Sequence, residues 1–264
     1  MKKETNYIEA NRIAWNEVAP IHAKQTLDEL LTHFQQPGYS CLDLVETQCL
    51  AKLNLEGKAV AQLCCNNGRE LLSIKNNGAG YCVGFDIANN FIVQAEQLKH
   101  AGNIDCEFLC TDVYDIPERY SNQFDLVYIS IGAICWLPDL PKFFAVVTRL
   151  LKPKGYLFLY DMHPILSMFD ENDQKDPPTL AYSYFNKQAN ICETGLDYYG
   201  NEKYVSAPMY WFHHKLSDII KACLIHHFNI KEFMEYEHDI CNVFGHFQKR
   251  KAQLPLCYTL LAQL

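Results

Sequence analysis

Five short apolar segments alternate with segments of helical periodicity in the middle of the chain. Between them the spacing predicts helices over residues 68–76, 89–101 and 139–151. A strand–helix–strand alternation of this kind predicts an α/β fold, in which helices cover both faces of a parallel sheet. The five predicted strands are Ala59–Leu63, Tyr81–Phe85, Glu107–Cys110, Phe124–Ile129 and Tyr156–Tyr160.

The segments on either side of this alternation predict further elements. Helices are expected over residues 5–19, where Pro20 would end the first, over 26–34 and over 213–224. Phe228–Tyr236 and Leu256–Ala262 predict two more strands, which would finish the sheet as an antiparallel pair. Residues 164–208 lack a sustained period and indicate an insertion after the fifth strand. We therefore expect an N-terminal helical segment over residues 1–56 and one domain over 57–264.

Composition narrows the class of protein. The chain has 264 residues, with 23 Lys and Arg against 31 Asp and Glu, and a formal net charge of −8. This balance argues against a nucleic-acid partner. No stretch is apolar enough to span a bilayer, and the first residues lack the apolar core of a secretory signal, so a cytoplasmic protein with no membrane partner is expected. The twelve cysteines include no C-x-x-C pair and complete no zinc-ligand set, so no metal is expected.

Polar side chains follow the predicted strands at the points where the strands end. Asp86 follows the second strand, Asp112 the third and Ser130 the fourth. Parallel sheets bind ligands in the crevice outside the carboxyl ends of their strands. A carboxylate at Asp86 could accept both hydroxyls of a ribose, and one at Asp112 could accept the exocyclic amine of adenine. Either acid could instead cap the helical turn that follows it.

The turn after the first strand has its own signature. Asn66, Asn67 and Gly68 tolerate the left-handed backbone that a tight strand-to-helix turn requires, so they predict a substitute for a glycine-rich loop. The turn lacks the G-x-G-x-x-G fingerprint of dinucleotide sites and the lysine of a nucleoside triphosphate site. This absence argues against NAD and FAD and against nucleoside triphosphates.

Taken together, these segments resemble class I S-adenosylmethionine-dependent methyltransferases, and the resemblance covers nearly the whole chain. It rests on the turn Val60–Gly68 and on Gly84–Ile87, Thr111–Val113, Phe124–Val127 and Leu150–Gly155. More narrowly, Asn11-Arg12, Ala14–Asn16, Cys135–Leu140 and His163-Pro164 resemble a bacterial subgroup that acts on small molecules.

The resemblance implies a Rossmann-like sheet of seven strands with the last antiparallel, an N-terminal helical lid and an insertion after the fifth strand. It implies S-adenosylmethionine as methyl donor, S-adenosylhomocysteine as product and a small-molecule acceptor, in a monomer or homodimer. The family usually has an acid where this chain has Gln62, and glycines where it has Cys64 and Asn66. A protein that binds these ligands without turnover is therefore the alternative. The implied cofactor-binding residues are Trp15, Cys64, Asn66, Gly68, Asp86, Ile87, Asp112, Val113 and Ser130.

The acceptor side offers aromatic and imidazole groups. Methyl transfer needs mainly alignment of the reactants and exclusion of water, and a base only where the nucleophile must lose a proton. His163, just beyond the fifth strand, is the candidate catalytic residue, and Trp15 could equally belong to the core. We expect the N-terminal helix and the insertion to close over the strand ends. The candidate acceptor-binding residues are His22, Trp136, Tyr184 and His213.

Overall fold

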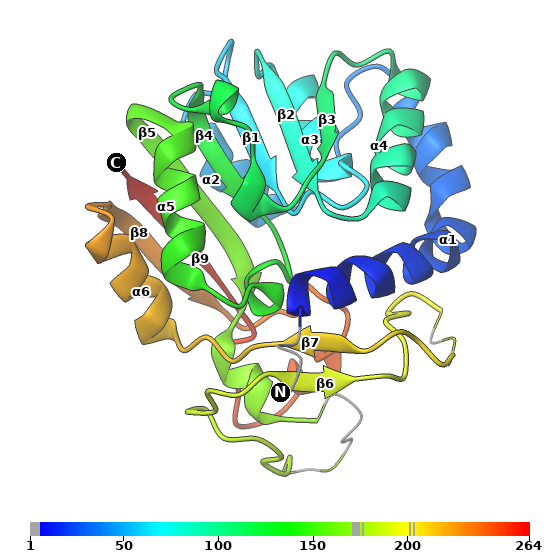
Figure 1. Ribbon diagram of the computed structural model, residues 1–264, viewed down its shortest axis with the longest axis vertical. Helices are drawn as coiled ribbons and strands as arrows, with labels where there is room; N and C mark the ends of the chain where they lie inside the picture. Colours follow the sequence, from blue (N-terminus) through cyan, green and yellow to red (C-terminus); the bar gives the residue numbers. More distant parts are fainter. Residues whose placement is uncertain (1–5, 171–174, 176, 201, 203) are drawn as a thin grey trace.

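The computed structural model describes residues 6–170, 175, 177–200, 202 and 204–264. Its centre is a seven-stranded sheet in the order β3-β2-β1-β4-β5-β9-β8 (Figure 1). Strands β1 to β5 are parallel, and β9 runs antiparallel to both of its neighbours, β5 and β8. The predicted fold and its antiparallel finish are therefore confirmed. The strands are β1 (Val60–Leu63), β2 (Cys82–Asp86), β3 (Glu107–Cys110), β4 (Phe124–Ile129), β5 (Leu151–Met162), β8 (Asn229–Tyr236) and β9 (Cys257–Gln263).

Helices cover both faces of this sheet because successive strand residues point to opposite sides. Ala61 and Leu63 belong to a buried cluster with α5 and α6, whereas Val60 belongs to a second cluster with α2, α3, α4 and the end of α1. The helices are α1 (Tyr7–Phe34), α2 (Leu44–Ala51), α3 (Arg69–Asn76), α4 (Asn89–Gly102), α5 (Leu140–Leu150) and α6 (Leu216–Ile225). Short 3-10 turns are η1 (Val113–Asp115), η2 (Glu118–Tyr120), η3 (Ile134–Trp136), η4 (Pro164–Met168) and η5 (Gly245–Phe247).

The prediction that Pro20 ends the first helix is wrong. Helix α1 runs through it for 28 residues, and Figure 1 shows the helix changing direction along its length. Proline has no N–H, so the carbonyl of Asn16, four residues earlier, loses its helical donor. Asn90 replaces that donor, because its Nδ2 lies 2.9 Å from the Asn16 oxygen. In return Asn16 Oδ1 accepts the backbone N–H of Asn90 at 2.9 Å, in the first turn of α4. Residue 5, where the predicted helix began, lies outside the described residues.

Strand β5 is longer than predicted, because it begins at Leu151 and so includes residues 152–155. The strand is kinked there rather than interrupted. Lys154 has a positive φ of 66°, and the register with β4 shifts between Phe124 and Leu126. Helix α2 was not predicted; Asp43 and Glu46 start it with a reciprocal capping box.

The insertion contributes a small second sheet that rests on α1. Strand β6 (Asn190–Cys192) pairs antiparallel with β7 (Met209–Trp211), just past the predicted end of the insertion. The buried Asn11 on α1 donates to the Tyr210 carbonyl at 2.8 Å and accepts the Tyr210 N–H at 2.7 Å. Figure 1 shows the first half of α1 lying between the large sheet and this hairpin. Within the described residues, no helix combines the length and apolarity needed to cross a membrane.

Candidate functional site

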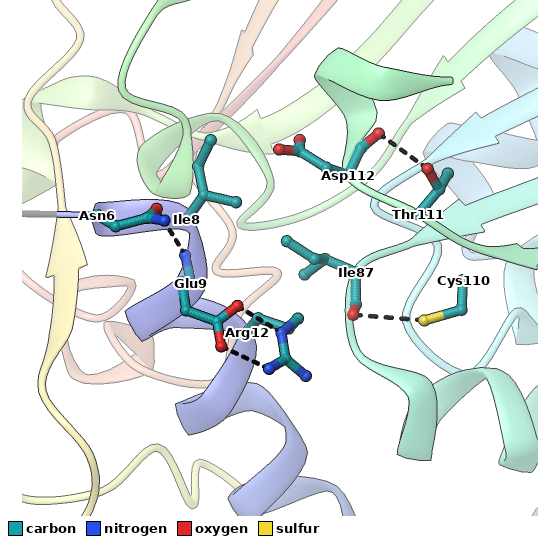
Figure 2. A pocket seen from close by; sticks show the side chains of 8 residues that line it. All are labelled: Asn6, Ile8, Glu9, Arg12, Ile87, Cys110, Thr111 and Asp112. Atoms are coloured by element: carbon teal, nitrogen blue, oxygen red, sulfur yellow. Dashed lines mark hydrogen bonds and ion pairs between the residues drawn. The ribbon is translucent and has the colours of Figure 1, made fainter. Parts of the chain in front are cut away.

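The carboxyl ends of β1 to β4 meet at one edge of the sheet. Leu63 is in register with both Phe85 and Ile129, and Asp86 is in register with Cys110, so the residues that follow these positions form one row. A cavity of about 380 Å³ opens at this row, under the first turns of α1 (Figure 2). It is lined by Asn6, Ile8, Glu9 and Arg12 on one side and by Ile87, Cys110, Thr111 and Asp112 on the other.

Asp86 organises the loops at this edge. Its Oδ2 accepts the backbone N–H of Asn66 at 2.8 Å, and its Oδ1 accepts that of Ala88 at 2.9 Å. The N-cap of α4 is Ala88, so Asp86 is not the helix cap itself. Burial raises the pKa of Asp86. A carboxylate has about four acceptor sites, so Asp86 keeps capacity for further hydrogen bonds such as those of a diol.

The loop after β1 has the backbone of a glycine-rich turn, although only one of its three positive-φ residues is glycine. Cys64 and Asn66 have positive φ angles of 55° and 50°, and Gly68 has 71°. A Cβ atom at Gly68 would come within 2.4 Å of the Phe108 ring, so only glycine fits there. The two positions at which the family carries glycine therefore keep a glycine-like conformation. The predicted turn is present at Asn66 and Gly68, and it includes Cys64 as well.

Asp112 lies across the cavity from α1. Its Oδ1 accepts the N–H of Tyr114 at 2.9 Å and so caps η1, as the alternative interpretation held. Figure 2 shows its carboxylate pointing toward Ile8 on α1. Burial raises the pKa of Asp112, and it also lines the cavity. Capping therefore uses one oxygen and leaves the other for a ligand. Val113, the next residue, is buried.

The loop after β4 connects the strand ends to α1. The buried Gln62 donates from Nε2 to Ser130 Oγ at 3.1 Å, at the ends of β1 and β4. Farther along the loop, the Trp136 ring meets the Trp15 ring edge-on at 5.3 Å. Trp15 also contacts Phe91 of α4 at 6.0 Å. Trp15 therefore joins α1 to both the β4 loop and α4, beside the cavity rather than in its lining.

The structure does not bring His163 into the cavity lining. Its Nδ1 accepts the Ile165 N–H at 3.1 Å, and its Nε2 lies 3.0 Å from the Glu235 carboxylate. Burial lowers its pKa, so at neutral pH the ring favours the neutral form. Its catalytic role stays a prediction.

Three candidate acceptor residues are held in contacts of the insertion. The ring of His22 packs 4.4 Å from that of Tyr198, and its Nε2 lies 3.0 Å from the Leu196 carbonyl. Tyr184 Oη accepts the first N–H of α6, from Leu216, at 3.0 Å. The His213 ring packs 6.1 Å from that of Tyr182 in the insertion. These contacts attach the insertion to its surroundings, and none of the three residues lines the cavity.

Sequence reasoning missed Asp161, near the end of β5. This side chain is only 4 % exposed, and burial raises its pKa to about 6. Its carboxylate accepts the N–H groups of Gly132 and Ile134, which fixes the loop that carries Trp136. The signal was present, because Asp161 follows the fifth apolar run as Asp86 and Asp112 follow theirs.

The comparisons with known proteins agree with this geometry. Residues 61–159, from β1 to β5, match the methyltransferase domain family. The chain carries a methyltransferase domain. The resemblance to class I methyltransferases is thereby confirmed. An uncharacterized protein of Haemophilus influenzae is 21 % identical over 234 residues, which span 83 % of this chain and 87 % of that protein.

Two shorter matches concern named enzymes. A tRNA U34 carboxymethyltransferase of Campylobacter curvus is 28 % identical over 111 residues, 42 % of this chain and 37 % of that enzyme. A ubiquinone biosynthesis O-methyltransferase of Neisseria meningitidis is 28 % identical over 106 residues, 40 % of this chain and 44 % of that enzyme. These matches span less than half of either partner, and the two enzymes differ in the kind of molecule that they modify.

Solved structures share the fold over most of the chain. An S-adenosylmethionine-dependent methyltransferase from Clostridium acetobutylicum aligns with a TM-score of 0.58 at 15 % identity, over 95 % of this chain and 98 % of that one. The [4+2]-cyclase SpnF aligns with a TM-score of 0.60 at 12 % identity, over 97 % of this chain and 95 % of that one. At such identities the likeness shows the fold.

Proposed function

We propose that this protein binds S-adenosylmethionine at the carboxyl ends of β1 to β4 and transfers its methyl group to a small molecule. The observation that carries the proposal is the cavity that Ile87 and Asp112 line at adjacent strand ends, opposite α1 and one residue from Asp86. Apolar groups of Ile8 and Ile87 suit the faces of an adenine ring, and Asp86 retains acceptors for a ribose.

The residues present fit the cofactor. The positive φ angles at Cys64, Asn66 and Gly68 hold the loop after β1 in the turn that gives a ligand close access to the backbone. Ser130, at the end of β4, would lie near the amino-acid end. When bound, S-adenosylmethionine supplies an already activated methyl group, so the protein needs no strong nucleophile of its own.

The chain's own groups would align the reactants and exclude water. Residues 1–56 would serve as the lid, because α1 lines the cavity and contacts the β4 loop through Trp15 and Trp136. The acceptor would be enclosed by α1 and the insertion, because two hydrogen bonds between Asn11 and Tyr210 join α1 to the β6–β7 hairpin. His163 would orient or deprotonate the nucleophile only if the acceptor reached beyond the end of β5.

A small-molecule acceptor is favoured over RNA. The formal net charge of −8 opposes a phosphate backbone. The twelve cysteines all lie in the described chain and are unpaired, which supports a reducing compartment such as the cytoplasm.

The second candidate function is ligand binding without turnover. It is favoured by Gln62, Cys64 and Asn66, which replace the acid and the glycines that the family usually carries. In this case the protein would hold S-adenosylmethionine or its product without transferring the methyl group.

A turnover assay separates the two functions. We expect purified protein and S-adenosylmethionine to form S-adenosylhomocysteine when the low-molecular-mass filtrate of a cell extract is added. The same extract's RNA fraction should support no more formation than buffer, and Asp86→Asn should be inactive with both. Binding of S-adenosylmethionine without product in any fraction would favour the second candidate. Product formation with RNA alone would overturn the small-molecule assignment.

A further inference from the structure

Asp161 is a buried acid for which the described part of the chain provides no ion-pair partner. Its Oδ1 accepts the N–H groups of Gly132 at 2.6 Å and Met162 at 2.7 Å, and its Oδ2 accepts that of Ile134 at 3.3 Å. Among the described residues, no Lys, Arg or His side chain forms an ion pair with it. Three backbone donors stabilise the carboxylate, yet a buried charge without a counter-charge remains costly. The positive charge of a bound ligand would compensate such a carboxylate.

The register places this charge beside the proposed cofactor site. Leu63 of β1 pairs with Ile129 of β4, and Ile129 pairs with Leu159 of β5. Asp161 is therefore two residues beyond this row, and two strand spacings, about 10 Å, separate β1 from β5. Asp86 and Asp112 lie on the other side of β1, at the ends of β2 and β3. The loop after β1 thus has carboxylates on both sides.

Electrostatics at Cys64 agree with this placement. Burial is the main cause that raises the pKa of its thiol, and the charges of Asp86, Asp112 and Asp161 each raise it further. Gln62, at the end of β1, is neutral and 0 % exposed. The negative field at the loop therefore comes from the three aspartates. With the adenosine on the side of Asp86 and Asp112, the sulfur of the cofactor would lie between them and Asp161.

We propose that Asp161 determines the charge specificity of the site, favouring the sulfonium of S-adenosylmethionine over the neutral thioether of S-adenosylhomocysteine. This inference rests on the proposed function. Two opposite unit charges about 10 Å apart at an effective dielectric constant of about 20 attract enough to change affinity about tenfold. The neutral product lacks this attraction, so Asp161 would promote exchange of product for fresh cofactor.

The test is a pair of dissociation constants, measured by calorimetry for S-adenosylmethionine and S-adenosylhomocysteine. In Asp161→Asn we expect the first ligand to bind about tenfold more weakly and the second to change less than about twofold. Gly132→Ala is the matched control. It strains the same loop, because Gly132 has a φ of 77°, but it keeps the charge. Its effect should be equal for both ligands.

The denaturation midpoint establishes that each variant is folded. If Asp161→Asn does not fold, Asp161→Ser replaces it, since a hydroxyl oxygen still accepts a backbone N–H. An equal loss of affinity for both ligands would mean that Asp161 only holds the loop. Unchanged affinity for both would mean that its charge does not contribute to binding. Each result overturns the inference. A wild-type protein that binds neither ligand instead refutes the proposed function.

Discussion

Replacing Asp86 with asparagine is expected to weaken S-adenosylmethionine binding by at least about tenfold. Charge-assisted hydrogen bonds from two ribose hydroxyls are each worth about 1.5–3 kcal/mol. The asparagine amide is uncharged and has one acceptor oxygen in place of two, so it cannot accept both hydroxyls in this way. Asp86→Ala should bind as weakly and also lose stability. The reason is that the N–H groups of Asn66 and Ala88 would lose their acceptor, at about 1–3 kcal/mol for each one left buried.

Asp115→Ala serves as the control for Asp86. Asp115 is an exposed acid in η1, one helical turn from the cavity-lining Asp112, so its removal changes the charge without removing the proposed ribose contact. It should bind nearly as the wild type does. A lower denaturation midpoint in Asp86→Asn with unchanged affinity would show that the carboxylate only supports the loops.

Deletion of residues 1–24 is expected to reduce cofactor affinity by at least about tenfold while the sheet stays folded. The deletion removes the helical wall of the cavity, which Ile8 and Arg12 contribute. It also uncovers Phe91 on α4, which is 1 % exposed beneath Val18 and Ala19. The two clusters on the faces of the sheet keep their members, because the α1 residues in them, Leu30 and Phe34, lie beyond the cut.

Calorimetry and circular dichroism test this deletion together. We expect a helical and strand content close to that of the wild type less the removed turns, and a lower denaturation midpoint from the uncovered apolar surface. Ile13→Ala is the matched control, because Ile13 is an α1 residue that is 40 % exposed and outside the cavity lining. If the truncated protein bound S-adenosylmethionine with wild-type affinity, α1 would not be a lid over the cofactor.

The sheet and the strand-end acids could be predicted because both depend on local pattern. Apolar runs of four to six residues mark buried parallel strands. Asp86 follows one of them directly, and Asp112 follows another after Thr111. The same rule would have found Asp161, had it been applied to the fifth run. The carboxyl ends of parallel strands meet at one edge of the sheet whatever the conformation of the loops. The location of the site can therefore be predicted from the strands alone.

The remaining features depend on contacts between distant parts of the chain. Pro20 stays inside α1 because Asn90, 74 residues beyond Asn16, donates to the carbonyl that the proline leaves free. The hairpin of β6 and β7 is fixed by Asn11 and Tyr210, which are 199 residues apart. His22 was expected to contact the acceptor because of its residue type, whereas its ring packs against Tyr198 and its Nε2 lies near the Leu196 carbonyl. Periodicity contains no information on such pairs.

The most direct measurement is a crystal structure of the protein soaked with S-adenosylhomocysteine. We predict the adenine between Ile87 and the side of α1 that carries Ile8, with its amine toward Asp112, and both ribose hydroxyls on the Asp86 carboxylate. The sulfur should lie on the side of β1 that faces β4. Ligand density at the edge of the sheet with these contacts would establish the site. Density elsewhere, or an empty edge in crystals soaked at saturating ligand, would contradict the account.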